Sequence, residues 1–322
     1  MKKKIIIVAG DPHSINAEII HKVWKKIDKK IKRKIFLIAN FKLIKAQFKK
    51  LNSKIHLIKL ENMDEIKKNN YLKIVDVPLN FKNPYNVPVS NSSEYIINSL
   101  NLAHKLASCK KEIKGIINCP INKKLIKSTN KIGVTEFLAS KNKTNNGSEV
   151  MMIHNKKISV VPLTTHIDIK KVSTKINSTF IQKKIKILNK SYKDLFKKKP
   201  KIGVLGLNPH NSELKKRSEE LLHIIPAIKK LKKIGLNISG PLVADTAFVK
   251  IYKNYDVIVG MYHDQVLTPF KSLFHYDAIN ITLGLDYIRV SPDHGPAIDL
   301  IKKNKASSLS LLKCIKFINN LN

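Results

Sequence analysis

Short runs of aliphatic and β-branched residues alternate along this chain with longer segments whose apolar residues recur at helical spacing. The first pattern is typical of strands and the second of amphipathic helices. Several short runs are apolar at every position, as expected for strands that helices cover on both faces. The runs predicted to form strands are 5–9, 35–39, 55–60, 116–119, 150–153, 158–162, 202–207, 257–261 and 279–283.

Two of the longer segments carry the helical pattern, and we expect their apolar stripes to lie in the core. The run Asn91-Ser92-Ser93-Glu94 is a typical helix start, so the second of these helices is predicted to begin there. The two stripes are Ile19, Ile20, Val23, Trp24, Ile27 and Ile31, and Ile96, Ile97, Leu100, Ala103, Leu106 and Ala107.

The alternation of strands and helices predicts an α/β fold with largely parallel sheets flanked by helices. A chain of 322 residues is long enough for one large domain or two medium ones. The lysine-rich stretch 193–201 is interpreted as a solvated connection between two halves. Ligands of such folds bind beyond the carboxyl ends of strands, so the loops that follow strands are where we look for chemistry.

The charge is strongly positive, with Lys+Arg 61 against Asp+Glu 23 and a formal net charge of +38. Only Arg33, Arg217 and Arg289 are arginines, and Lys, Asn and Ile are the residues of A/T-rich codons. A protein selected to grip phosphate backbones uses more arginine, and no nucleic-acid-binding module is visible. The positive field is therefore read as attracting anionic substrates. A basic, non-catalytic nucleic-acid-binding protein stays open as an alternative of another class.

The three cysteines, Cys109, Cys119 and Cys314, form no CxxC pair. This sparse set favours a reducing compartment and argues against a disulfide framework or a cysteine zinc site. The apolar run 5–10 near the N-terminus is too short for a signal peptide or a membrane span. We therefore expect a cytoplasmic protein without a membrane partner.

Three histidines each follow the end of a predicted strand: His166 in Thr164-Thr165-His166, His210 in Asn208-Pro209-His210-Asn211, and His263 in Tyr262-His263-Asp264-Gln265. If their strands are neighbours, the three imidazoles converge on one crevice. Three imidazoles with an open position suit Zn²⁺ or a similar divalent ion. The alternative is that each is a separate, hydrogen-bonded loop histidine.

Arg289 is a lone arginine in a chain that otherwise uses lysine. It is a candidate for a bidentate contact to a carboxylate or a phosphate, with a structural ion pair as the alternative. Lys271 lies eight residues past His263 and could add a point charge for a phosphate.

A series of motifs between about residues 5 and 313 resembles the 4-hydroxythreonine-4-phosphate dehydrogenase family of pyridoxal phosphate biosynthesis. The Tyr-His-Asp-Gln and Asn-Ile-Thr-Leu-Gly blocks are the specific ones. The motifs stand in the family's order at 10–12, 119–123, 133–139, 207–210, 240–246, 261–265, 280–289 and 293–295.

The resemblance implies a homodimer with a two-domain fold like that of isocitrate and isopropylmalate dehydrogenases, and an active site at the domain cleft and the subunit interface. Residues 1–130 with 290–322 would form the first domain, on the cofactor side. Residues 131–289 would form the second, on the metal and dimer side.

The resemblance also implies the ligands of the site. One divalent ion (Zn, Mg or Co) would be held by His166, His210 and His263. These ligands would come from both subunits. Thr135, Lys271, Asn280 and Arg289 would contact the phosphorylated amino acid substrate. Asp293-His294-Gly295 is similar to the loop that meets the adenosine half of NAD or NADP, which points to His294 and Gly295.

The implied reaction oxidises 4-phosphohydroxy-L-threonine to 2-amino-3-oxo-4-phosphooxybutanoate, which loses CO₂ to give 3-amino-2-oxopropyl phosphate. The metal would lower the pKa of the substrate's secondary hydroxyl and stabilise the enolate that develops on decarboxylation. Asp245 and Asp264 are candidates for a general base.

The chain departs from the family pattern in three places. Ser14 and Asn16 replace two glycines of the first loop, so its backbone must avoid positive φ or accept strain. Val134 replaces a histidine that contacts substrate, and 211–216 replaces a glycine-rich stretch. These changes leave open a related substrate, such as a threonate or erythronate phosphate, or a loss of activity.

Overall fold

The computed structural model describes residues 3–61, 63, 70–129, 133–141, 149–275 and 277–321. The chain divides into two compact units. Unit 1 comprises Met1–Lys143 and Asp286–Asn322, and unit 2 comprises Thr144–Leu285. The sequence placed approximate boundaries at 130/131 and 289/290, and the segment around Val134 and Thr135 belongs to unit 1.

Unit 1 is built on six parallel strands among its described residues. In spatial order they are β3 (Leu57–Leu60), β4 (Leu72–Asp76), β2 (Ile35–Ala39), β1 (Lys4–Val8), β5 (Ile113–Asn118) and β12 (Arg289–Pro292). Strand β2 is buried at every residue and β1 at all but its first, which explains their continuous apolar sequence. Strand β12 is also buried at every residue, although it contains Arg289 and Ser291.

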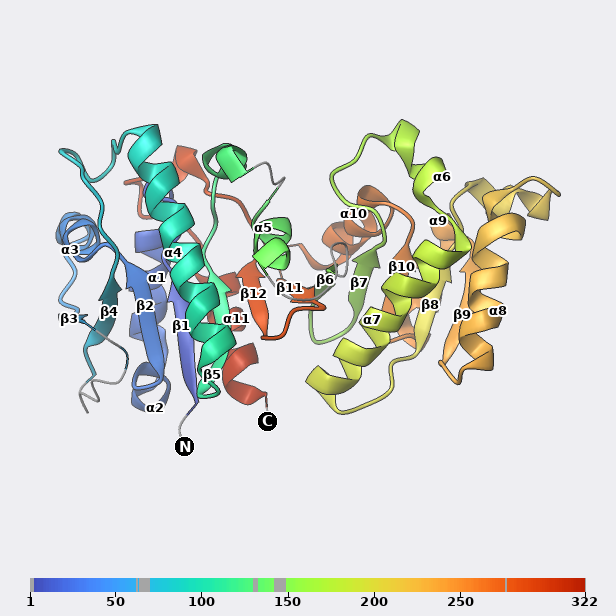
Figure 1. The fold of residues 1–322 in the computed structure, drawn as a ribbon, viewed down its shortest axis with the longest axis horizontal. Helices are drawn as coiled ribbons and strands as arrows, with labels where there is room; N and C mark the ends of the chain where they lie inside the picture. Colours follow the sequence, from blue (N-terminus) through green and yellow to red (C-terminus); the bar gives the residue numbers. More distant parts are fainter. Residues whose placement is uncertain are drawn as a thin grey trace. The chain divides into compact units, whose positions relative to one another are not determined.

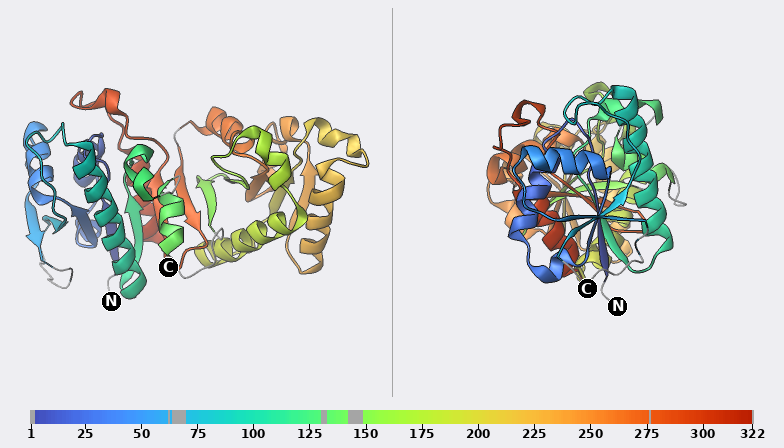
Figure 2. Two further views of the ribbon diagram at one scale, coloured as in Figure 1. Left: turned by 45° about the horizontal axis from the view of Figure 1, so that its top comes forward. Right: turned by 90° about the vertical axis from the view of Figure 1, so that its left-hand side faces the viewer.

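Helices cover both faces of this sheet, as Figure 2 shows for the blue and teal segments. Helix α1 (Asn16–Lys26) packs against α3 (Phe41–Lys50) and α11 (Leu309–Asn320), while α4 (Val89–Cys109) packs on β1, β2 and β5. Trp24 is buried in α1, which confirms that its stripe belongs to the core. Short helices α2 (Lys29–Lys32) and α5 (Val134–Lys141), with the 3₁₀ turns η1 (Lys123–Thr129) and η6 (Ile298–Leu300), complete unit 1.

Unit 2 has a mixed sheet (Figure 1). Its order is β11 (Ile279–Leu283), β6 (Val150–His154), β7 (Ser159–Pro162), β10 (Val257–Gly260), β8 (Ile202–Leu205) and β9 (Ile238–Leu242). The pairs β11–β6 and β6–β7 are antiparallel, whereas β7, β10, β8 and β9 run parallel to one another. The predicted fold class is therefore confirmed.

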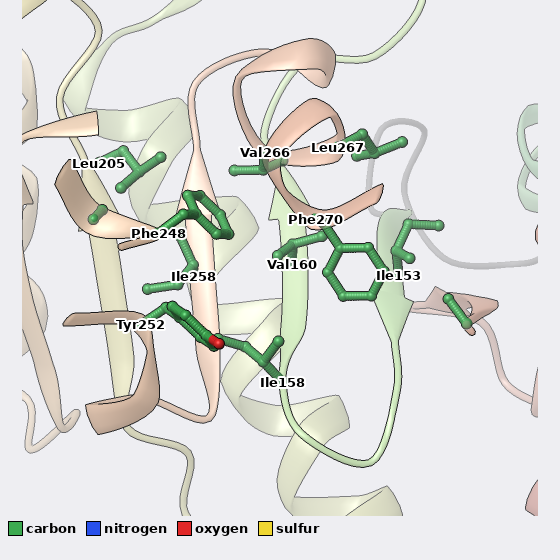
Figure 3. Close-up of a cluster of buried hydrophobic side chains, with 12 residues drawn as sticks. Ile153, Ile158, Val160, Leu205, Phe248, Tyr252, Ile258, Val266, Leu267 and Phe270 are labelled. Atoms are coloured by element: carbon green, nitrogen blue, oxygen red, sulfur yellow. The ribbon is translucent and has the colours of Figure 1, made fainter. Parts of the chain in front are cut away.

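The helices of unit 2 are α6 (Val172–Lys175), α7 (Ser178–Phe196), α8 (Ile225–Lys233), α9 (Ala244–Ala247) and α10 (His263–Phe274). Short turns η2 (Ile169–Lys171), η3 (Pro209–Leu214), η4 (Glu220–Ile224) and η5 (Ile251–Asn254) lie between them. Figure 3 shows the core that fixes α10: Val266, Leu267 and Phe270 pack with Val160 and Ile258 of the sheet. This buried cluster anchors the helix that begins at His263.

Three predictions of local structure were wrong. Helix α4 begins at Val89 after Pro88 and not at the 91–94 run, because Pro88 supplies the extended residue that precedes the helix. The 193–201 stretch lies within unit 2, where it ends α7 and leads into β8. Strands β4, β9 and β12 were not predicted, since each interrupts its apolar run with a charged residue, glycine, proline or serine. Among the described residues, no helix is long and apolar enough to cross a membrane.

Candidate functional site

The three predicted metal-binding histidines follow three neighbouring parallel strands of unit 2. His166 follows β7, His210 follows β8 and His263 follows β10, and β10 lies between the other two strands. Parallel strands end at the same edge of a sheet, so the three loops lie side by side. The sequence analysis required that the three strands be neighbours, and they are.

Hydrogen bonds join these loops to one another. The Thr164 backbone N–H and hydroxyl both donate to the Met261 carbonyl, at 3.1 and 2.7 Å, which ties the His166 loop to the His263 loop. The Gln265 side chain accepts from the Met261 N–H at 2.7 Å and donates to the Gly206 carbonyl at 2.7 Å. It thereby links the start of α10 to the end of β8.

The rings of His166 and His263 lie next to each other, with centroids 5.9 Å apart and planes tilted by 36°. Nδ1 of His263 lies 2.7 Å from Oδ1 of Asp264. A carboxylate on one ring nitrogen is the usual way in which a metal-binding histidine is oriented, with the other nitrogen left for the ion. Asp264 is thus placed to orient His263, which is a different role from that of the expected general base.

His210 does not complete this pair within one chain. Among the described residues, no group of three or more His, Cys, Asp and Glu side chains is arranged to hold a metal. Two imidazoles with a carboxylate behind one of them fit two ligands of a divalent ion. The gathering of all three histidines around one ion stays a prediction.

His166 and His210 both adopt a left-handed backbone conformation, with φ of 41° and 49°. Non-glycine residues rarely take up this conformation, and where they do the strain is concentrated at functional sites. His210 belongs to η3, in which His210, Asn211, Ser212, Glu213 and Leu214 all have φ between 48° and 57°. Glycines would adopt this left-handed conformation without strain, whereas here five non-glycine residues adopt it.

The remaining candidates of unit 2 lie in different settings. Asp245 is exposed in the first turn of α9, which follows β9 at the same sheet edge. Lys271 lies in the last turns of α10, and Asn280 lies on β11. Oδ1 of Asn280 is buried and has no hydrogen-bond partner among the described residues. It is thus an acceptor suited to a donor from outside the chain.

In unit 1, Arg289 is buried, and Asn118 and Thr135 are among the side chains that hold it. Its Nε donates to Oδ1 of Asn118 at 2.6 Å, and one terminal nitrogen donates to the Thr135 hydroxyl at 3.1 Å. Burial lowers the pKa of Arg289 to about 10, against partial compensation from nearby Tyr287 and Glu136. The guanidinium stays charged at neutral pH, and two predicted substrate residues are in direct contact.

The structure adds Asn118, which sequence analysis did not single out. It is the last residue of β5, and Arg289 is the first residue of the neighbouring strand β12. A polar residue directly after the apolar pair Ile116-Ile117, at the carboxyl end of the strand, was the available signal. Its partner could not be inferred, because β5 and β12 are separated by most of the chain.

The altered first loop of unit 1 avoids positive φ where its glycines are replaced. Neither Ser14 nor Asn16 has positive φ, and Asn16 begins α1. Nδ2 of Asn16 donates to the Pro120 carbonyl at 2.8 Å. Gly10, at φ 76°, remains a glycine because a Cβ there would lie 2.8 Å from both Asn16 Nδ2 and the Pro120 oxygen. The replacement residue therefore joins the first loop to the 119–123 loop.

The His294-Gly295 loop of unit 1 leaves a ring nitrogen without a partner. Nδ1 of His294 lies 3.0 Å from the Gly295 carbonyl, whereas its Nε2 is buried and unpaired among the described residues. A Cβ at Gly295 would meet open space. A buried nitrogen next to an open backbone fits the edge of a planar ligand such as a nucleotide base.

These features define a largely parallel α/β fold with polar groups concentrated at the carboxyl ends of its strands, the arrangement of α/β enzymes. The chain belongs to the family described as pyridoxal phosphate biosynthetic protein PdxA, whose model matches residues 30–318. The family resemblance seen in the sequence is therefore confirmed.

Individual proteins agree with this assignment. A 4-hydroxythreonine-4-phosphate dehydrogenase from Aquifex aeolicus is 38% identical over 325 residues, 100% of this chain and 99% of that protein. A putative D-threonate 4-phosphate dehydrogenase from Oceanobacillus iheyensis is 32% identical over 98% of this chain and 96% of that protein. The crystal structure of the 4-hydroxythreonine-4-phosphate dehydrogenase from Klebsiella pneumoniae is 27% identical and covers 98% of each chain with a TM-score of 0.84.

Proposed function

We propose that this protein is an oxidoreductase, a 4-hydroxythreonine-4-phosphate dehydrogenase that acts in pyridoxal phosphate biosynthesis. The main support is that the three histidine loops of unit 2 follow three adjacent parallel strands. The chain also matches this family along nearly its whole length. A nicotinamide cofactor accepts the hydride, and His294 and Gly295 are proposed to contact its adenosine half.

Substrate binding is assigned to Thr135 and Arg289 of unit 1 and to Lys271 and Asn280 of unit 2. Arg289 and Lys271 are cations that neutralise the phosphate and the carboxylate of the substrate. The unpaired Oδ1 of Asn280 accepts a hydrogen bond from the substrate's ammonium or hydroxyl. Asn118 accepts a hydrogen bond from Nε of Arg289 and so helps to fix the orientation of the guanidinium group.

His166, His210 and His263 are proposed to hold one divalent ion, which when bound would acidify the substrate hydroxyl and stabilise negative charge during decarboxylation. Asp264 orients the imidazole of His263 through its 2.7 Å contact with Nδ1. Asp245 remains a candidate for moving the hydroxyl proton, because it lies at the same sheet edge and is open to solvent.

A homodimer with a shared site is proposed on two observations. The described part of one chain holds no three-ligand group, and a second copy could supply the missing ligand. Exposed apolar side chains also follow the histidines in both outer loops: Ile167 and Ile169 after His166, and Leu214, Leu221 and Leu222 after His210. Exposed apolar side chains near a site are suited to burial in an interface.

The second candidate is a dehydrogenase of a related phosphorylated hydroxy acid, because Val134 cannot make the hydrogen bond of the family histidine and one relative carries the name D-threonate 4-phosphate dehydrogenase. The deciding assay follows NAD and NADP reduction with 4-phosphohydroxy-L-threonine and with D-threonate 4-phosphate, each with and without a chelator. Faster turnover of the first substrate, lost on chelation, supports the proposal. Turnover of the second alone, or activity that chelation leaves intact, contradicts it.

A further inference from the structure

The η3 turn that carries His210 is left-handed over five consecutive residues, none of which is glycine. Such a backbone persists only where the surrounding structure imposes it. The groups that impose it are therefore part of how His210 is presented.

One buried carboxylate secures the entrance to this turn. Glu220, at the start of η4, is fully buried, and its Oε1 accepts hydrogen bonds of 2.8 Å from the backbone N–H groups of both Leu207 and Asn208. Its Oε2 accepts from the Asn208 side-chain amide at 3.1 Å. Both oxygens are thus used by the two residues that precede Pro209 and His210.

A second attachment follows on the far side of His210. Nδ2 of Asn211 donates to the Pro241 carbonyl at 3.2 Å, and Oδ1 of Asn211 occupies the space where Gly206 lacks a side chain. His210 itself is exposed between these two anchored asparagines. The backbone on either side of His210 is therefore fixed while its ring faces solvent.

We propose that Glu220 is a positioning residue for His210: its carboxylate holds the left-handed turn in the form that presents the imidazole to a divalent ion. The inference rests on the proposed function, since that function supplies the ion. Glu220 is not itself a ligand, because it is fully buried and both of its oxygens accept hydrogen bonds from Leu207 and Asn208.

The variant Glu220→Gln tests this with little change in volume. If the new glutamine amide keeps its oxygen on the two backbone N–H groups, its NH₂ group points toward the side-chain NH₂ group of Asn208. Two hydrogen-bond donors then face each other and cannot bond. Loss of the Asn208 contact should loosen the turn. Asn208→Ala removes the same contact from the other side, together with the 2.7 Å bond that the Asn208 amide donates to Glu219, and leaves the core carboxylate in place.

Glu18→Gln is the matched control in unit 1. Glu18 is also a buried carboxylate, and it accepts from the Ala306 N–H and from Lys22, both at 2.7 Å. It belongs to unit 1, whereas the histidine loops belong to unit 2. The Glu18→Gln variant therefore shows how the loss of a buried carboxylate changes the stability of the protein without a direct effect on the His210 turn.

Two readouts on the full-length protein decide the question. Hydrogen exchange of the metal-free protein should be faster at 207–214 in Glu220→Gln and Asn208→Ala than in the wild type or Glu18→Gln. The dissociation constant for Co²⁺, followed by calorimetry and by the visible spectrum of the bound ion, should rise roughly tenfold in the first two variants only, as for other groups that orient metal ligands.

Unchanged exchange at 207–214 in Glu220→Gln would overturn the inference, as would an equal loss of Co²⁺ affinity in Glu18→Gln. If the wild type itself binds no Co²⁺, the proposed metal site fails. The exchange measurement then still decides whether Glu220 holds the turn.

Discussion

Nε of Arg289 donates a 2.6 Å hydrogen bond to Oδ1 of Asn118 across the β5–β12 edge of unit 1. The buried arginine is thus oriented by a neutral acceptor, while nearby Tyr287 and Glu136 favour its charged form. A buried cation whose direction is fixed by its neighbours is suited to an anionic ligand.

Arg289→Lys should raise KM for the phosphorylated substrate at least about tenfold, because lysine cannot keep the hydrogen bonds to both Asn118 and Thr135. Steady-state kinetics measures the change. Arg217→Lys is the control, since Arg217 is exposed and should leave KM at the wild-type value. Equal KM values for the two variants would exclude Arg289 from substrate binding.

His210→Ala should remove bound metal and activity while leaving the fold intact, because the ring is exposed and its loop is anchored by neighbours. Metal content by mass spectrometry, activity and circular dichroism test these three points. His56→Ala serves as control, as His56 is an exposed histidine of unit 1 that contacts the Tyr71 ring. Normal turnover by a metal-free His210→Ala protein would reject the metal assignment.

Val134→His should lower KM several-fold by restoring a hydrogen-bonding side chain beside Thr135 at the start of α5. Val89→His makes the same exchange at the first residue of α4, where Val89 is exposed, and should have no effect on KM. An unaltered KM for Val134→His would indicate that another group already replaces the family histidine.

Asn16→Ala should destabilise the protein by about 1 kcal/mol, because it removes the hydrogen bond to the Pro120 carbonyl that joins two loops of unit 1. Urea unfolding measures the free energy. Asn101→Ala, a helical asparagine in α4, is the comparison and should be neutral. Equal unfolding midpoints for the two variants would assign no stabilising role to Asn16.

Burial lowers the pKa of His154 to about 4. The unfolded chain, with an ordinary histidine pKa near 6.5, takes up this proton first, so stability should fall as pH falls from about 6.5 towards 4. The effect is at most about 3 kcal/mol. Unfolding by urea at pH 7.5, 5.5 and 4.5 should show a smaller decline in His154→Gln than in the wild type. The same decline in both would show that His154 does not contribute.

The sequence alone determined the fold class and the strands that build the edge of the site. Continuous apolar runs such as 35–39 and 257–260 can only be buried on both faces, and this forces helices onto either side of the sheet. The same local reasoning placed His166, His210 and His263 after strands, because the linear sequence is enough to recognise a histidine that follows an apolar run.

Only the tertiary structure decided which groups meet. Strand β10 lies between two strands that are distant from it in the chain, and Arg289 contacts Asn118 from another distant segment. Glu220 binds Leu207 and Asn208 across a left-handed turn. Hydrophobic periodicity reports whether a side chain is buried, but it carries no information about its partner. Strand order and side-chain hydrogen bonding depend on how the whole unit packs.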